Sequence, residues 1–179
     1  DHTRLINGET LVLTVDFSDA GALDAPWGVA VDWGDGSAQT ADTLNSQASA
    51  VPYTHQFPMV TSPTTYALSA CVTDKDSDQG CDNTQSIEVI TAQDALADLI
   101  ADIEWLENEG RLHNGNGLIA KLQGIIAKLD RGDTDAACNE FGAFNNQVNA
   151  FIGSGHLSPA NGQDLLDKSG RIMAAVGCS

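Results

Sequence analysis

Val29-Ala-Val-Asp-Trp-Gly-Asp-Gly-Ser37 is the stretch that decides the fold of the first half of the chain. Its apolar residues occupy every second position as far as Trp33, so one face of a strand is apolar. The Gly-Asp-Gly that follows is typical of a tight turn, because glycine adopts backbone angles that other residues avoid. We therefore predict a strand that buries Trp33, and a turn in which Asp35 has a structural role rather than acting as a ligand or base.

Three further segments before Thr91 show the same alternation. Their apolar positions are Leu11, Leu13, Val15 and Phe17; Tyr66, Leu68, Ala70 and Val72; and Ile87 with Val89. Short alternating strands separated by turn-rich segments are typical of a β-sandwich, whose two inner faces make one core. Residues 1–91 are therefore predicted to form an all-β, immunoglobulin-like sandwich.

After Thr91 the apolar residues recur at every third or fourth position, which indicates amphipathic helices. Four such segments follow one another up to Val176. Asp133 can cap the third helix, and Ser158 with Pro159 can open the fourth, while Gly110 and Gly132 are predicted to end the first and second. Residues 92–179 are therefore predicted to form an all-α antiparallel four-helix bundle, so the fold class is two-domain.

The chain has four cysteines, which permit three disulfide connectivities. Cys71 and Cys81 flank one acidic loop, which a bond between them would staple. Cys138 lies near the start of one predicted helix and Cys178 at the end of the next, so antiparallel helices would bring them together. We expect these two pairs rather than a zinc site, since the chain has no Cys-x-x-Cys. Disulfides place the protein outside the cytoplasm.

The charge of the chain excludes some partners. The formal net charge is −17, and residues 1–91 carry thirteen acidic residues against Arg4 and Lys75. Nucleic acid and anionic lipid would be repelled. No run approaches the roughly 20 apolar residues that span a bilayer, so we expect no membrane insertion.

Asp74-Lys-Asp-Ser-Asp-Gln-Gly80 places carboxylates at Asp74, Asp76 and Asp78, a spacing that lets a curled backbone aim oxygens at one Ca²⁺. It is not an EF-hand, since the glycine comes one residue late and Gln85 stands at the twelfth position. The alternative is a solvated turn in which the Asp side chains accept hydrogen bonds from their own backbone.

Three segments of the first half resemble the PKD domain, an immunoglobulin-like β-sandwich of extracellular proteins. They are Val31-Asp-Trp-Gly-Asp-Gly36, Tyr53-Thr-His-Gln-Phe57 and Tyr66-Ala-Leu-Ser-Ala-Cys-Val-Thr-Asp74. The resemblance implies a structural hydrogen bond for His55. Some PKD-like domains bind calcium through this last loop and through the segment before the Trp strand, where this chain has Asp16, Asp19 and Asp24.

The second half resembles FIMAH, a small helical domain at the C-terminal ends of secreted and surface proteins of bacteria and archaea. The matching residues are Gly117-Leu-Ile-Ala-Lys-Leu122, Leu129-Asp-Arg-Gly132, Ala136-Ala-Cys-Asn-Glu-Phe-Gly-Ala-Phe-Asn-Asn-Gln-Val148 and Gly155-His-Leu-Ser158. This resemblance implies an extracellular or cell-surface setting in a prokaryote more than it implies an activity.

No motif for nucleophilic catalysis, zinc hydrolysis or phosphate binding occurs in the sequence, and we expect no enzyme. The sequence predicts a non-catalytic extracellular module for adhesion, spacing or assembly, whose partners are a protein or polysaccharide at the cell surface, or copies of itself. Two narrower hypotheses stay open. The chain is either the repeating subunit of a surface filament or layer, or a polysaccharide-binding accessory part of a larger secreted hydrolase.

Overall fold

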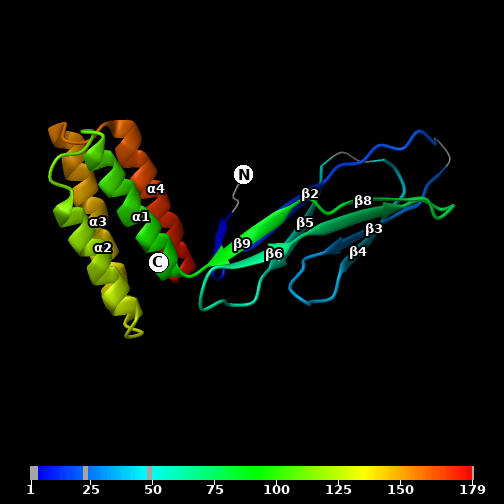
Figure 1. The fold of residues 1–179 in the computed structure, drawn as a ribbon, viewed down its shortest axis with the longest axis horizontal. Helices are drawn as coiled ribbons and strands as arrows, with labels where there is room; N and C mark the ends of the chain where they lie inside the picture. Colours follow the sequence, from blue (N-terminus) through cyan, green and yellow to red (C-terminus); the bar gives the residue numbers. More distant parts are fainter. Residues whose placement is uncertain (1–3, 22–23, 48–49, 179) are drawn as a thin grey trace. The chain divides into compact units, whose positions relative to one another are not determined.

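The computed structural model describes residues 4–21, 24–47 and 50–178. Contacts within the chain divide it into two units, Asp1–Ile90 and Thr91–Ser179. Within the described residues, the first unit contains nine strands and the second contains four helices (Figure 1). The predicted order of a β region followed by an α region is therefore confirmed.

The strands of the first unit form three hydrogen-bonded sheets in a sandwich-like arrangement. The strands are β1 (Arg4–Ile6), β2 (Thr10–Val15), β3 (Trp27–Asp32), β4 (Thr40–Leu44), β5 (Val51–Gln56), β6 (Thr64–Ala67), β7 (Ser69–Thr73), β8 (Gln79–Asp82) and β9 (Ser86–Ile90). Their order is β1-β9-β6 in one sheet, β2-β5 in the second and β4-β3-β7-β8 in the third. The neighbours pair antiparallel except β1 and β9, which are parallel.

The segment from Tyr66 to Asp74 is two strands rather than the single one that its alternation predicts. β6 pairs with β9, whereas β7 pairs with β3 and β8. Leu68 lies between the two strands, and its N–H donates to the carbonyl of Gln85. The apolar face continues through this break, since Tyr66, Leu68, Ala70 and Val72 all contact one core. The break therefore changes the partners of the segment and leaves its buried face intact.

Trp33 lies at the centre of that core, as predicted, with 1% of its surface exposed. Its indole Nε1 donates to Thr40 Oγ1 at 3.0 Å, so the polar atom of the buried ring is satisfied. The ring of His55 stacks on the indole with a centroid distance of 4.8 Å and an interplanar angle of 7°. The strand and the segment around His55 are thereby fixed to each other.

The Gly-Asp-Gly turn after Trp33 depends on its first glycine and on its aspartate. Gly34 has φ +71°, and a Cβ there would lie 2.1 Å from the carbonyl oxygen of Ala67, so a larger residue does not fit. Asp35 accepts a hydrogen bond from the Ser37 N–H at 2.9 Å and contacts His55 Nε2 at 2.7 Å. Asp35 and His55 therefore have the structural roles that we expected.

Asp35 is held in its ionised form by these contacts. Burial of the carboxyl raises its pKa, but the hydrogen bonds from Ser37 and His55 outweigh burial and lower the pKa to about 2. The side chain is only 3% exposed. The folded turn therefore favours the ionised form of Asp35, and the ionised carboxylate stabilises the turn at neutral pH.

The third and fourth helices of the second unit begin at the caps that the sequence predicts. The helices are α1 (Ala92–Asn108), α2 (Asn116–Leu129), α3 (Thr134–Ser154) and α4 (Pro159–Ala175). Thr91 and Asp94 form a capping box at α1, Asp133 accepts from the Ala136 N–H at α3, and Ser158 accepts from the Asn161 N–H at α4. The cap at the end of α2 is Asp130 rather than Gly132, which lies two residues beyond with φ +72°.

The four helices enclose an apolar core. α1 contacts α2 and α4, and α3 contacts the same two helices. The fully buried side chains include Leu96, Ile103, Leu118, Leu122, Ile125, Phe141, Phe144, Val148 and Leu165. Phe151, which lies in the same helix as Phe141 and Phe144, is only half-buried. None of the described helices has the length and apolar character needed to cross a membrane.

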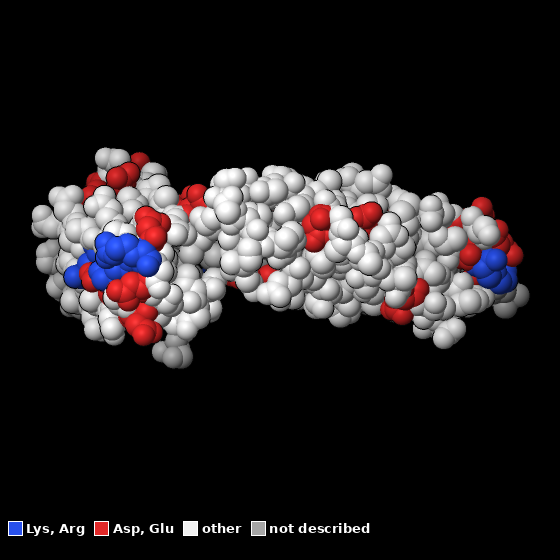
Figure 2. Space-filling model, turned by 90° about the horizontal axis from the view of Figure 1, so that it is seen from below, with Lys and Arg blue, Asp and Glu red and all other residues white. Residues whose placement is uncertain are grey.

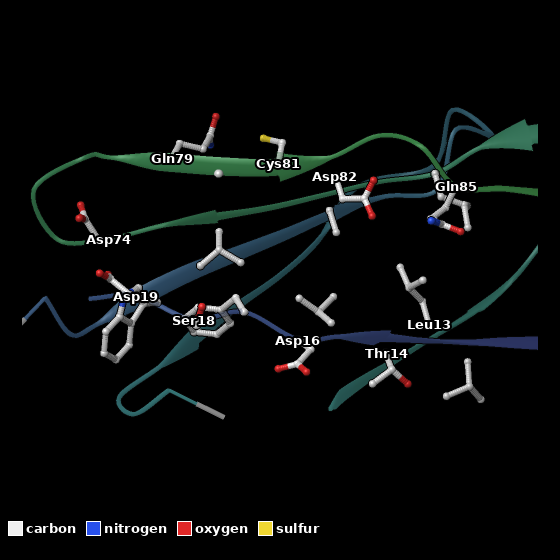
Figure 3. Close-up of a pocket in the computed structure, with 18 of the residues that line it drawn as sticks. Leu13, Thr14, Asp16, Ser18, Asp19, Asp74, Gln79, Cys81, Asp82 and Gln85 are labelled. Carbon is white, nitrogen blue, oxygen red and sulfur yellow. The ribbon is translucent and has the colours of Figure 1, made fainter. Parts of the chain in front are cut away.

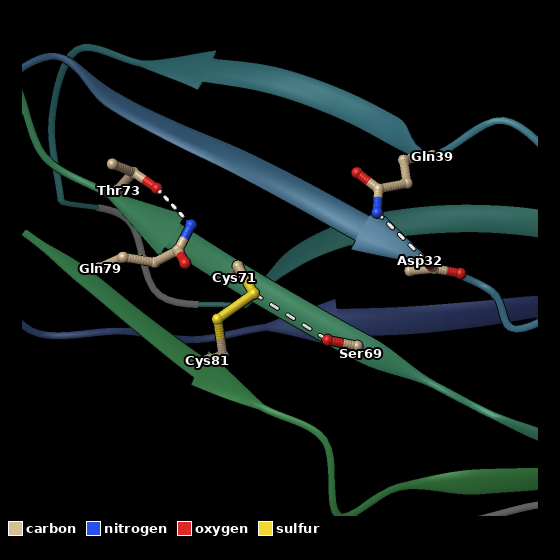
Figure 4. The surroundings of a disulfide bond; sticks show 7 residues. All are labelled: Asp32, Gln39, Ser69, Cys71, Thr73, Gln79 and Cys81. Carbon is tan, nitrogen blue, oxygen red and sulfur yellow. Dashed lines mark hydrogen bonds between the residues drawn. A yellow bond between two sulfur atoms is a disulfide. The ribbon is translucent and has the colours of Figure 1, made fainter. Parts of the chain in front are cut away.

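Each unit contains one disulfide, and the two pairs are those that we expected. Cys71 in β7 is bonded to Cys81 in β8, and Cys138 in α3 is bonded to Cys178 just after α4. In Figure 4, the first disulfide lies on the same face of its sheet as Thr73 and Gln79, whose side chains are hydrogen-bonded to each other. This is the outer face, because the inward-facing residues of β7 are Ala70 and Val72.

Candidate functional site

An open groove of about 1230 Å³ runs along the first unit between β2 on one side and β7 with β8 on the other. Its apolar lining includes Leu5, Leu11, Leu13, Val15, Phe17, Trp27, Leu68, Ala70, Val72 and Ile87. Figure 3 shows Gln79, Cys81 and Asp82 along one rim, and Leu13, Thr14 and Asp16 along the other. The groove is therefore lined by inner faces of the sheets and rimmed by two strands.

The groove exists because one sheet is too narrow to cover the other. β2 and β5 form a sheet of two strands, whereas β7 and β8 belong to a sheet of four. Leu13, Ala70 and Val72 are consequently only half-buried, while Val31 on the covered part of the wide sheet is fully buried. Gly80 in β8 pairs with Val72 and lines the same opening, and a Cβ placed there would meet no atom within 4 Å.

Both rims of the groove are free strand edges. Among the described residues, β2 pairs only with β5, and β8 pairs only with β7. The Cα atoms of Cys71 and Cys81 are 4.1 Å apart, the short spacing of an antiparallel pair that exchanges no backbone hydrogen bonds. The N–H and C=O of Cys81 therefore point away from β7. By the alternation of the ladder, those of Gln79 do the same.

One end of the groove is acidic. Asp19, Asp24 and Asp74 each offer a carboxylate oxygen, and these oxygens lie within 4.8 Å of one another. Asp74 follows β7, whereas Asp19 and Asp24 come from the segment between β2 and β3. Figure 3 shows Asp19 and Asp74 facing each other at this end. The fold thus brings together two acidic segments that are some fifty residues apart in the sequence.

Two of these carboxylates already have structural partners. Asp74 Oδ1 accepts from the N–H groups of Asp76 at 2.8 Å and Asp78 at 2.9 Å. Asp19 accepts from the Gly21 N–H and from the indole of Trp27, and these bonds lower its pKa. The loop from Asp74 therefore has the hydrogen bonds of a solvated turn, in which an Asp side chain accepts from the backbone of its own loop. This turn is the alternative to a metal site.

A basic side chain also neutralises part of the cluster. Lys75 Nζ lies 3.2 Å from Asp24 Oδ1 and 2.6 Å from Asp76 Oδ2. The hydrogen bonds that Lys75 donates to Asp76 and to Asp24 raise the pKa of Lys75, so it stays charged. Acidic side chains nevertheless predominate on the face of the molecule drawn in Figure 2, with basic ones in small patches.

Of the six residues predicted to hold Ca²⁺, three come together. Asp16, Asp76 and Asp78 lie outside the group formed by Asp19, Asp24 and Asp74. Ca²⁺ takes six to eight oxygen ligands, so these three residues would supply only part of a coordination shell. Calcium binding stays a prediction.

The groove itself was missed by reasoning from the sequence, although two signals for it were present. Thr10–Val15 contains no charged residue and no proline, the devices that usually protect an edge strand. Gly80 interrupts an otherwise ordinary strand segment and leaves space on its inner face. Neither signal identifies a groove without the strand order.

The chain matches no protein-family model, and no curated protein sequence is significantly similar to it.

Proposed function

We propose that the chain is a non-catalytic extracellular module for adhesion, spacing or assembly, and that the groove of its first unit is the surface through which it acts. The observation that carries this proposal is the groove itself. It combines an apolar floor with two strand edges whose backbone groups are unpaired among the described residues. Such a surface suits a macromolecule, since small-molecule sites are usually smaller, with volumes of about 300–1,000 Å³.

The two disulfides support the extracellular part of the proposal. Disulfides form and persist in oxidising compartments and are rare in the cytosol. Cys71–Cys81 fastens a rim of the groove, and Cys138–Cys178 fastens the last two helices. The PKD-like and FIMAH-like patterns of the two halves agree with a prokaryotic cell surface, and we propose both assignments on those patterns.

We further propose that the acidic end of the groove binds Ca²⁺ weakly. The support is the convergence of Asp19, Asp24 and Asp74 within 4.8 Å. Water would have to complete the shell, and Lys75 would have to release Asp24. Both requirements lower the affinity, so binding belongs in the millimolar range of extracellular modules.

The proposed function is tested with the purified chain, its disulfides intact, in three parallel measurements. Sedimentation velocity over a wide range of concentration detects self-association, which the filament-subunit hypothesis requires. Binding assays with purified polysaccharides test the accessory-module hypothesis, and assays with extended polypeptides test a protein partner. We expect association or binding in at least one measurement. A chain that stays monomeric and binds neither class of polymer would contradict the proposal.

A further inference from the structure

We propose that the groove is completed by an extended polypeptide strand of another chain, which adds to the free edge of β2. Its alternate apolar side chains would lie on the groove floor, and a lysine or arginine at one end would lie among the carboxylates. This inference rests on the proposed function, because it names the partner of the same groove. Three independent properties of the groove support it.

The first property is the backbone of β2. Its six residues span roughly 20 Å, enough for a strand of ordinary length. Natural proteins protect exposed edges with charges, prolines or bulges, whereas Thr10–Val15 has no charged residue and no proline. Val12 is 58% exposed beside this edge. An added strand would pair the outward backbone groups of β2 and give main-chain affinity.

The second property is the shape of the floor. Leu11, Leu13 and Val15 face it from β2, and Ala70 and Val72 face it from β7. Every second residue of an added strand would point to this floor, because side chains alternate between the two faces of a strand. Gly80 leaves open space there for such a side chain. The partner is therefore a strand with alternating apolar residues.

The third property is charge. Asp16, Asp19, Asp74, Asp78 and Asp82 all line the groove. Lys75 pairs with Asp24 and Asp76. A cationic side chain at the end of the added strand would relieve the repulsion among the lining carboxylates, and complementary charge also speeds association. The partner strand is therefore basic at the end that reaches this cluster.

Charge also argues against a second copy of the same chain as the occupant. Each copy carries a formal net charge of −17, so pairing the β2 edges of two copies would bring two strongly acidic surfaces together. A chain with a basic strand would not meet this repulsion.

The probe for this proposal is a synthetic peptide in which valine and threonine alternate over six positions, followed by two lysines. One control peptide has the same composition with its valines in a single block, and another has two glutamates in place of the lysines. Calorimetric titration of the full chain gives stoichiometry and affinity. We expect one alternating peptide per chain. The glutamate peptide should bind about tenfold more weakly, and the difference should shrink as salt is added.

A matched pair of variants in β8 locates the binding site. Gly80→Ile fills the open space on the inner face, so it should lower the affinity for the alternating peptide by about tenfold. Gln79→Ile adds the same side chain to the neighbouring residue on the outer face, so the affinity should stay within about twofold. Thermal unfolding of both variants checks that the fold is kept, since neither change removes a core side chain.

Hydrogen exchange followed by nuclear magnetic resonance tests the backbone contact directly. The bound alternating peptide should slow exchange of the β2 amides that do not face β5, while the amides of the helical unit should be unaffected. The inference is overturned if the alternating peptide binds no better than the block peptide, if Gly80→Ile leaves binding unchanged, or if the β2 amides gain no protection. If the chain self-associates and Gly80→Ile abolishes the self-association, the occupant of the groove is a second copy, and the inference is also overturned.

The results separate this inference from the broader proposal. A chain that ignores all peptides but binds polysaccharide or self-associates elsewhere refutes the inference alone. A chain that shows no binding and no association in any measurement refutes both.

Discussion

The two units of this chain close their cores in different ways. In the helical unit each helix contacts two others, and side chains such as Ile103, Phe141 and Leu165 are fully buried. In the β unit Leu13 and Val72 remain half-buried, because a sheet of two strands lies against a sheet of four. The helical unit is complete within the described residues. The β unit leaves an apolar surface open, which locates the candidate interaction site there.

The largest effect is expected at the centre of the β unit. Trp33→Ala should lower the free energy of unfolding of that unit by about 3–5 kcal/mol, because a large core aromatic is lost and a cavity remains. Chemical denaturation followed by circular dichroism would show the transition of the β unit shifted to lower denaturant and the transition of the helical unit unchanged. The matched control is Trp105→Ala in α1, a tryptophan that is half-exposed and should cost less than about 1 kcal/mol. Equal effects of the two changes would contradict the assignment of Trp33 to the core.

The next effect compares the two disulfides. Replacing Cys138 and Cys178 by serine should destabilise the helical unit by roughly 3–4 kcal/mol, since that bond closes a loop of 40 residues. The same replacement at Cys71 and Cys81 should cost the β unit less, roughly 2–3 kcal/mol, because the separation is 10 residues. Thermal unfolding of the two double variants measures both. If the shorter loop proves more important, the chain-entropy model does not describe this protein.

A smaller effect is expected on acidification of the β unit. The pKa of Asp35 is about 2 in the folded chain, below the usual value of 3.8. The stabilisation that the ionised Asp35 gives to the β unit is therefore fully present above about pH 4 and is lost as the pH falls through about 2. This stabilisation is at most on the order of 2 kcal/mol. Urea unfolding at a series of pH values should show this loss. Asp35→Asn should be less stable at neutral pH and should lack this part of the pH dependence. If the unfolding free energy of the variant and of the unmodified chain changed with pH in the same way, the lowered pKa of Asp35 would be contradicted.

The smallest effect is that of calcium, which should act on the β unit alone. Calcium at a concentration equal to its dissociation constant would raise the stability of that unit by about 0.4 kcal/mol. Asp74→Asn should abolish the increase, and the helical unit should not respond. Differential scanning calorimetry with calcium and with a chelator makes the comparison. An unchanged transition in millimolar calcium would identify the acidic loop as a turn only.

Local patterns predicted the elements and their caps better than they predicted the sheet. Alternation placed Trp33 in a core, and short-range signals located the caps at Asp133 and Ser158. These features depend on neighbours within a few residues, so one sequence contains enough information. The break at Leu68 depends instead on partners far along the chain, namely β9 on one side and β3 with β8 on the other.

The candidate site shows the same limit. Acidic residues could be named as candidate ligands, but the sequence could not select Asp19, Asp24 and Asp74 from the six. It also could not show that Lys75 pairs with Asp24 across 51 positions. The groove results from the absence of a strand beside β2 among the described residues, and no local pattern encodes an absence.

The parallel pairing of β1 with β9 determines how the β unit would respond to mechanical force. Arg4 lies opposite Glu88 and Ile6 opposite Ile90, and α1 begins two residues after β9. Tension between the residues before β1 and those after β9 would pull the two strands in opposite directions along their length. The ladder would then be loaded in shear, so its hydrogen bonds would have to break together rather than one after another. When tension is applied along the chain, this short pair of strands would therefore be the first part of the β unit to resist unfolding.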